Sequence, residues 1–327
     1  DSDQNANTGK SFSANLIIQE EPMTIGLGNF AEYITNLYTE DGVYDLYYHD
    51  GTGTYGAQEA GDNSYRYSGA NPNNYVCFGS DEATCPSDNL YRIIGVFENQ
   101  VKLIKSDYAN SDLLGANGGY SSSTYSNTSS SYYKGSKTTI NRYYWNINDV
   151  NTWSESGLNT VNLNINYLNN IGETWANKIA TTTWQVGGMA RNNTYTAKQY
   201  YETELGTDAT NTTYEAKIGL AYVSEYGYGV DQNYWTIALS NYTSSNDYNW
   251  MFMGLNEWTI SRVSSGSTYA FSIDYNGELY ISNVHVTGFA PGAIGVYDRA
   301  IRPTFYLNSD VAYISGTGTQ TDPYRIN

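Results

Sequence analysis

The sequence predicts an α+β fold, in which antiparallel hairpins are joined by a few short helices. The clearest hairpin places strands at 270–273 and 279–281 around the turn DYNG at 274–277. An Asn-Gly pair between two apolar segments is a strong short-range signal of a hairpin. Apolar residues at spacings of three and four predict helices over 24–40 and in pieces between 153 and 180. Together these patterns favour the α+β class.

The N-terminal segment begins polar, and residues 12–18 then read as a lone strand. The helix at 24–40 would present one apolar side, made of Leu27, Phe30, Ile34 and Leu37. A strand without an obvious hairpin partner is a candidate for pairing between chains. The pattern therefore leaves two arrangements open. The segment packs on its own domain, or residues 1–40 contact another subunit.

Residues 41–105 predict a turn-rich region followed by strands. Aromatic side chains are interleaved with turn residues over 41–62, and short strands follow at 64–69 and 75–78. A strand at 90–97, the turn Glu98-Asn99 and a strand at 101–105 form the clearest hairpin of the first half.

The middle of the chain alternates between surface and core patterns. A Ser/Tyr/Gly-rich stretch near 106–140 predicts a long surface excursion, because its run GANGGYSSSTYSNTSSSYYKGSK has almost no aliphatic residue. Helices are expected at 153–169, 171–180 and 196–205, and a strand at 181–188.

The C-terminal third predicts most of the core. A strand is expected at 217–223, followed by a turn at 224–229. Trp250 and Trp258 belong to a crowded apolar stretch before the DYNG hairpin, and residues 302–307 predict a final core strand. Pro303 is tolerated at the start of that strand, where a missing N–H costs little. A last short strand at 324–326 would close the fold by pairing near the N-terminal half.

Composition limits the classes of partner. The formal net charge is −17 with only 16 Lys plus Arg, so charge-driven binding to nucleic acid or anionic lipid is disfavoured. No apolar run approaches the roughly 20 residues of a membrane span. The chain has 35 tyrosines and many uncharged polar residues, a composition common in extracellular β-rich and recognition surfaces. We expect an extracellular or cell-surface location.

Cysteine and histidine usage argues against catalysis. Cys77 and Cys85 are the two cysteines, and a short-range disulfide between them fits an exported protein. His49 and His285 lie far apart in the sequence, which disfavours a Ser–His dyad and a histidine-based metal site. We expect no enzymatic activity and no cofactor.

Calcium is the one metal that the side chains suggest. Asp274, Asn276 and Glu278 alternate along the hairpin turn and carry hard oxygen ligands. The alternative is ordinary turn chemistry with a solvated carboxylate, which we favour at an Asn-Gly turn.

Several motifs resemble those of a known family. In chain order they are SYRYSGANPNNYVCFG, LYRIIGVFENQVKLIKSD, TTTWQVGG, KIGLAYVSEYGYG, NWMFMGLNEWTISR and IRPTFYLNSDVAYISGTGTQTDPYRIN. They are similar to exported, lectin-like proteins of gut Firmicutes, some of which look like the variable proteins of diversity-generating retroelements.

The resemblance implies a C-type-lectin-like domain of the formylglycine-generating-enzyme variant over 61–327, with an N-terminal extension over 1–60. In that fold a strand with a tryptophan, here Trp258, precedes a variable hairpin, and an Arg-Pro strand, here Arg302-Pro303, follows it. Enzymes with this fold use paired cysteines near the C-terminal half, and this chain has none there. A single sequence leaves open whether residues 263–300 are hypervariable or fixed. The Glu-Pro-Asn and Trp-Asn-Asp triplets of calcium-dependent lectins are absent.

The functional hypothesis is a binding protein, an adhesin or receptor for a protein or glycan ligand. Its predicted ligand-binding face gathers Ser264, Ser267, Tyr269, Tyr275, Tyr280, Asn283, His285, Tyr297 and Asp298. Tyrosines can stack on sugar or peptide, or they can simply be cross-strand partners that stabilise the hairpin. The alternative function is a structural subunit of a surface filament or pilus, assembled through residues 1–40.

Overall fold

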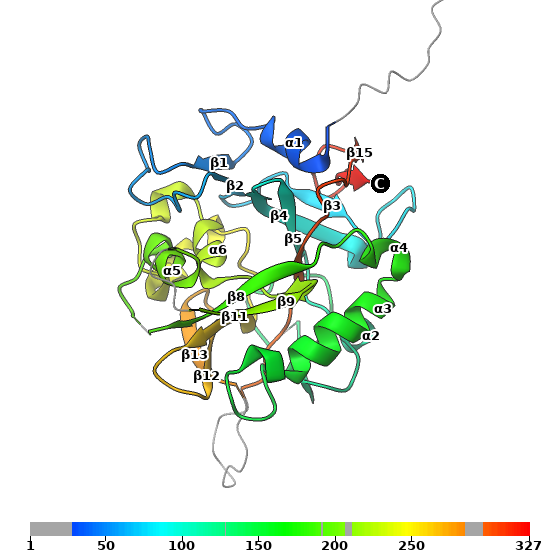
Figure 1. Ribbon diagram of the computed structural model, residues 1–327, viewed down its shortest axis with the longest axis vertical. Helices are drawn as coiled ribbons and strands as arrows, with labels where there is room; N and C mark the ends of the chain where they lie inside the picture. Colours follow the sequence, from blue (N-terminus) through cyan, green and yellow to red (C-terminus); the bar gives the residue numbers. More distant parts are fainter. Residues whose placement is uncertain (1–27, 128, 191, 207–210, 285–296) are drawn as a thin grey trace, which may run out of the picture.

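The computed structural model describes residues 28–127, 129–190, 192–206, 211–284 and 297–327 (Figure 1). Within these ranges the fold is mixed α+β, with two main sheets and short helices. The expected strand at 12–18 and His285 lie outside the described residues. No helix in the described part is long and apolar enough to span a bilayer.

The larger sheet joins the first half of the chain to its C-terminal part. Its strands run in the order β1-β2-β4-β5-β14-β10, and β3 pairs with β4 beside them. Their bounds are β1 Leu46–His49, β2 Ser64–Tyr67, β3 Tyr75–Cys77, β4 Leu90–Phe97, β5 Gln100–Lys105, β10 Ile218–Gly219 and β14 Thr304–Tyr306. The expected hairpin at 90–105 is confirmed, and β14 is the expected strand after Pro303.

The second sheet carries the DYNG hairpin. Its strands run in the order β13-β12-β11-β8-β9, with β8 and β11 parallel and the other pairs antiparallel. Their bounds are β8 Thr182–Met189, β9 Asn211–Ala216, β11 Glu257–Val263, β12 Tyr269–Ile273 and β13 Leu279–Asn283. The turn between β12 and β13 contains Gly277 at φ +94°, a conformation that favours glycine. The predicted hairpin is therefore confirmed.

Two small ribbons complete the strands of the described chain. β6 (Tyr120–Ser126) and β7 (Thr139–Tyr143) pair inside the expected surface excursion, so part of that stretch is ordered as a hairpin. β15 (Tyr313–Ser315) pairs with β16 (Arg325–Ile326) at the end of the chain. The backbone of Tyr324 also exchanges hydrogen bonds with Tyr75 and Cys77, which confirms the predicted closure onto the first half.

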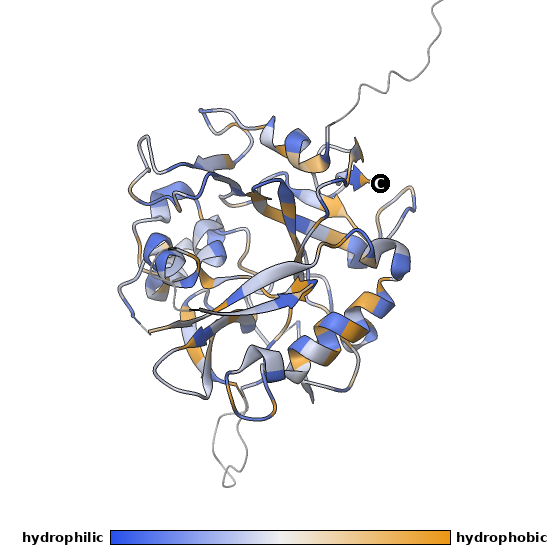
Figure 2. Ribbon diagram, viewed as in Figure 1, coloured by the Kyte–Doolittle hydropathy of each residue, from blue (hydrophilic) through white to orange (hydrophobic). Residues whose placement is uncertain are grey.

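Short helices flank the sheets on two sides (Figure 1). They are α1 Phe30–Thr35, α2 Ser111–Leu114, α3 Leu168–Asn170, α4 Glu173–Ala176, α5 Ala197–Glu204 and α6 Val223–Tyr228. A π-helix, Leu158–Tyr167, leads directly into α3, and 3-10 turns occupy Ser87–Asn89, Trp153–Glu155, Gln232–Tyr234 and Leu239–Tyr248. Figure 2 shows hydrophobic and polar residues alternating along the helical segment before α4, as expected for a helix with one buried side.

Helix α1 is shorter than predicted and packs on its own domain. It begins after Asn29, whose side chain accepts a hydrogen bond from the N–H of Glu32, as a helix N-cap does. Phe30 and Ile34 are buried, and the N–H of Phe30 donates to the carbonyl of Val311. Strand β1, which the sequence assigned to an N-terminal extension, is hydrogen-bonded to β2.

The prediction was wrong between 217 and 229. The expected long strand is limited to β10, and α6 forms where a turn was expected. The carboxylate of Glu225 accepts the N–H of Tyr222 and so stabilises the first turn of α6. The same carboxylate pairs with the buried ammonium of Lys102 at 2.5 Å, a contact between residues 123 positions apart. Tertiary contacts therefore override the local turn signal.

The core is rich in aromatic side chains and contains paired charges. Trp145, Trp184, Trp235 and Trp258 are fully buried. Arg302 pairs with Glu257 at 2.8 Å inside the protein. Removal of one partner of such a buried ion pair strongly destabilises a protein, because the other charge is left buried without compensation.

Candidate functional site

The predicted hairpin face does bring tyrosines to the surface. Tyr269 is 42% exposed, Tyr275 is 49% exposed and Tyr280 is 46% exposed. Ser264 and Ser267 are also exposed, in the turn between β11 and β12. Asn283 is half-buried and lies opposite Tyr269 in the register of β12 and β13.

The register separates two of these tyrosines. Tyr280 pairs with Ser272, whereas Tyr269 pairs with Asn283. Successive side chains of a strand point to opposite faces, so Tyr269 and Tyr280 project from opposite faces of the ribbon. Tyr275 lies in the turn at the far end of β12. The hairpin thus displays tyrosines without gathering Tyr269 and Tyr280 into one patch.

One residue of the predicted face is not at the surface. Asp298 is fully buried and forms an ion pair with Arg142. The burial of Asp298 corrects the expectation that it is exposed, because Arg142, 156 positions away in the sequence, pairs with the carboxylate in the interior. Tyr297 is half-buried, with its ring centroid 5.5 Å from the guanidinium carbon of Arg299.

The calcium candidates make turn contacts. One carboxylate oxygen of Asp274 accepts the N–H groups of Asn276 at 2.8 Å and Glu278 at 3.0 Å. The carboxylate of Glu278 accepts the hydroxyl of Thr243. Across the described ranges, no three His, Cys, Asp or Glu side chains are grouped so that they could hold a metal ion.

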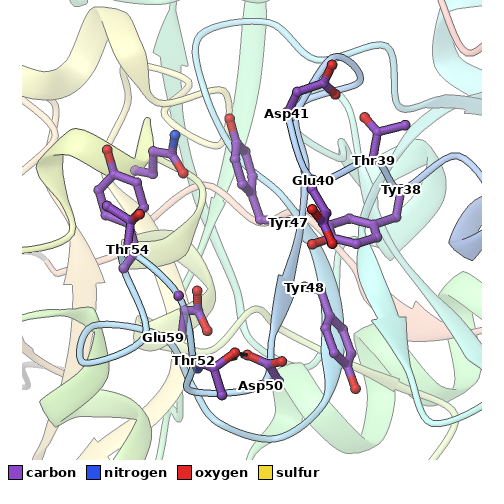
Figure 3. A pocket seen from close by; sticks show the side chains of 13 residues that line it. Tyr38, Thr39, Glu40, Asp41, Tyr47, Tyr48, Asp50, Thr52, Thr54 and Glu59 are labelled. Carbon is purple, nitrogen blue, oxygen red and sulfur yellow. Dashed lines mark hydrogen bonds between the residues drawn. The ribbon is translucent and has the colours of Figure 1, made fainter.

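A concave site lies apart from the predicted hairpin face, around β1 (Figure 3). It is a pocket of about 510 Å³ in which aromatic rings and carboxylates alternate, and we refer to it as the tyrosine–acid pocket. Its lining consists of Tyr38, Thr39, Glu40, Asp41, Tyr47, Tyr48, Asp50, Thr52, Gly53, Thr54, Tyr55, Glu59 and Gln232.

The rings of this pocket are held by other rings. Tyr48 packs on Tyr65 with centroids 4.6 Å apart, and Tyr38 lies 5.5 Å from the same ring. Tyr47 and Tyr55 both make edge contacts with the buried Trp235. Because β1 and β2 fix Tyr48 and Tyr65 in one sheet, the aromatic wall is preorganised.

The carboxylates of the pocket have different surroundings. Asp50 accepts the N–H and the hydroxyl of Thr52, and the hydroxyl contact is the largest cause that lowers the pKa of Asp50. Glu59 is buried and accepts the N–H of Gly51 at 2.9 Å. Burial raises the pKa of Glu59, and the neighbouring charge of Asp50 adds to the rise.

Glu40 and Asp41 are exposed at the other wall, in the segment that follows α1. No hydrogen bond or ion pair joins their carboxylates to other described residues. The pocket lining includes no lysine or arginine. Four carboxylates beside four tyrosines therefore make a site suited to a cationic group.

His49 ends β1, directly before the loop whose residues line the pocket. Its imidazole is buried beside Tyr228 and Trp235, and Nδ1 accepts the N–H of Ala60 at 3.1 Å. Burial is the main cause that holds the pKa of His49 well below its ordinary value. A neutral histidine that accepts from the backbone fixes the loop after β1.

Sequence reasoning missed this pocket. Most of its residues lie between 38 and 59, but Gln232 joins them from a distant part of the sequence. The available signal was the interleaving of tyrosines with turn residues over 41–62, which we assigned to turns.

Comparison with known proteins finds no family model, no curated protein and no solved structure that matches this chain. The lectin-like resemblance therefore rests on the sequence motifs alone.

Proposed function

We propose that this chain is an extracellular or cell-surface binding protein that acts by recognition and has no catalytic activity. Its lectin-like resemblance and its tyrosine-rich, histidine-poor composition support this class. The C-type-lectin-like arrangement is part of the same proposal. It agrees with the mixed α+β architecture, and it goes beyond what that architecture alone establishes.

The observation that carries the proposal is the tyrosine–acid pocket. At about 510 Å³ it falls within the range of ligand-binding clefts. Four carboxylates line it without a lining cation, so a positively charged group entering it gains attraction from several directions. A cation over a tyrosine ring adds roughly 0.5–2 kcal/mol.

The ligand class that fits best is a basic side chain on a protein partner. A lysine or arginine carries its charge at the end of an apolar stem, and the stem would pack on the tyrosine rings. Hydroxyl groups of Thr39, Thr52 and Thr54 supply further hydrogen-bonding partners at the rim.

The experiment compares two double variants with the same change in charge. Glu40→Gln with Asp41→Asn removes two pocket carboxylates, and Asp81→Asn with Glu82→Gln removes two exposed carboxylates next to the disulfide. Isothermal titration with a lysine-containing tetrapeptide should show roughly tenfold weaker binding for the pocket variant only, given the size of exposed charge interactions. The acetyl-lysine form of the peptide should not bind.

Equal affinity in the two variants would reject the pocket as the contact site. Turnover of a glycan or peptide by the purified protein, abolished by one carboxylate substitution, would reject the non-catalytic proposal.

The filament or pilus subunit is the second proposal. It depends on residues 1–27, which lie outside the described residues, and α1 makes its contacts within its own domain. A filament that displays this domain is compatible with a binding function.

A further inference from the structure

A second pocket has the opposite charge character. It measures about 340 Å³ and is lined by residues of β3, β4 and the segment 134–136, among others. We call it the Arg92 pocket. Its lining consists of Ala70, Asn71, Tyr75, Ser87, Leu90, Arg92, Ser106, Asp107, Lys134, Gly135, Ser136, Trp250, Met253 and Gln320.

Arg92 is a buried cation that has no carboxylate partner among the described residues. Its side chain lies in β4, is 6% exposed and sits between the rings of Tyr75 and Trp250, at 4.3 Å and 4.6 Å. Nε donates to the amide oxygen of Asn74 at 2.7 Å, and Nη2 donates to the carbonyl of Pro72 at 3.0 Å. Nη1 makes no hydrogen bond to any described residue.

Two of the other buried arginines of the described chain have a carboxylate partner, whereas Arg299 donates only to the carbonyl of Asp298 and the hydroxyl of Ser282. Arg66 contacts Asp62 at 2.5 Å, and Arg302 contacts Glu257 at 2.8 Å. A buried guanidinium normally has such a partner, because the desolvation of an unpaired charge is costly. Burial lowers the pKa of Arg92 to about 10, and the charge of Arg302 contributes.

Lys134 brings a second cation to the same pocket. Its ammonium donates to the carbonyl of Asn246 at 2.9 Å and lies 5.1 Å from the ring centroid of Phe252. No carboxylate of the described residues lies within ion-pair distance of it. Burial lowers the pKa of Lys134, Asp247 opposes this shift and Arg92 reinforces it.

Asp107 is the one carboxylate in the lining, and its oxygens are already engaged. They accept the N–H of Tyr108 at 2.7 Å, the hydroxyl of Tyr133 at 2.8 Å and the N–H of Ser136 at 3.1 Å. Asp107 thus anchors the segment that carries Lys134. With two cations and one carboxylate, the lining has a net charge of about +1 in a chain whose net charge is −17.

We propose that the Arg92 pocket binds the carboxylate of a small ligand. The carboxylate would accept hydrogen bonds from Nη1 of Arg92 and from the ammonium of Lys134, and the apolar part would lie against Trp250 and Met253. A single negative charge balances the lining, whereas a dianionic phosphate would leave it negative. Hydrogen bonds between charged partners are about twice as strong as neutral ones, which favours an ionised ligand. The volume is at the small end for ligand pockets.

Two classes of ligand carry a carboxylate of this kind, an acidic monosaccharide and the C-terminal residue of a peptide. Titration of the full chain with glucuronic acid, N-acetylneuraminic acid and N-acetylalanine separates them. Methyl esters of the three probes and inorganic phosphate serve as ligand controls. We expect at least one acid to bind and its ester to bind roughly tenfold more weakly, because the ester removes the charge.

Matched variants locate the site. Lys134→Gln should weaken binding of the acid by roughly tenfold. Lys137→Gln makes the same change in charge three residues later, at a lysine that pairs with Asp88, and should leave the affinity unchanged. Arg92→Lys keeps the charge, loses the planar donor group and should also weaken binding.

The proposal fails if none of the three acids binds the native protein. It also fails if the acid and its ester bind equally, if phosphate binds in preference to every acid, or if Lys134→Gln binds like Lys137→Gln. Should Arg92→Lys unfold, as shown by loss of the thermal transition, the comparison of the two lysine variants still decides the question.

Discussion

The ring of Tyr33 lies flat on the ring of Tyr313, with centroids 3.7 Å apart and planes inclined by 6°. Tyr33 belongs to α1 and Tyr313 begins β15, so the pair joins the start of the described chain to its end. Tyr324 contacts both rings at their edges. The three tyrosines hold α1 on its own domain.

This contact should be measurable as a coupling energy. A double-mutant cycle with Tyr33→Ala and Tyr313→Ala should give about 1 kcal/mol of interaction in the free energy of unfolding, as aromatic pairs do. Chemical denaturation of the four proteins provides the values. Tyr33→Ala combined with Tyr248→Ala, whose partner is Tyr234, should be additive. Coupling in that control, or its absence in the first cycle, would contradict the assignment.

The disulfide between Cys77 and Cys85 closes a loop of eight positions between β3 and β4. A Cys77→Ser, Cys85→Ser variant should lose about 2–3 kcal/mol of stability, because a short closed loop restricts the unfolded chain. Urea denaturation measures the loss. The wild type should show no reactive thiol when unfolded without reductant, and two titratable thiols there would disprove the bond.

Asp62 should make the free energy of unfolding fall at acidic pH. Burial alone would raise its pKa, but Arg66 and the hydroxyl of Ser64 outweigh burial and lower the pKa to about 2. As the pH falls, the carboxylate of the unfolded chain, with a pKa near 3.8, therefore binds a proton before the carboxylate of the folded protein does. The stabilisation is complete above pH 3.8 and disappears as the pH falls towards 2.

Protonation of Asp62 should lower the free energy of unfolding by about 2 kcal/mol. Asp62→Asn should be less stable than wild type at pH 6 by at least that amount, since Arg66 is left unpaired. The gap should close by pH 2. Asp81→Asn, at an exposed position, should follow the wild-type curve. A gap that stays constant from pH 6 to pH 2 would refute the assignment to Asp62.

Deletion of residues 1–22 tests the filament proposal. Because α1 keeps its contacts with Val311 and Tyr313, the shortened chain should fold with an unchanged melting temperature. If the full chain forms fibres under the electron microscope, the deletion should abolish them. Fibres that persist would show that the predicted strand, with Phe12, Leu16 and Ile18, is not the joint between subunits.

Local patterns predicted the α+β class and many of the single strands and helices. The hairpin β12–β13 follows from strand periodicity around an Asn-Gly turn, and β4–β5 follows from two apolar strands around Glu98-Asn99. Both signals lie within about 15 residues of sequence. The helix at 196–205 was also predicted, and the structure stabilises its start with a local capping box at Thr196 and Gln199.

What the sequence did not predict depends on contacts between distant residues. Helix α6 replaces an expected turn because Glu225 pairs with Lys102 in the core. Asp298 is buried because Arg142 accompanies it. The tyrosine–acid pocket includes Gln232, which lies more than 170 positions after the other residues of its lining. Charge and spacing along the chain do not encode these encounters.

Ala312 connects the segment before α1 to the last residue of the described chain. Its backbone bridges Asn29, and it also exchanges hydrogen bonds with the main chain and the side chain of Asn327. The first and last described elements therefore meet at one residue, on the same side of the molecule and away from β12 and β13 (Figure 1). The contacts of Ala312 thus couple the start of α1 to the residue after β16, so a local opening of either segment would loosen the other.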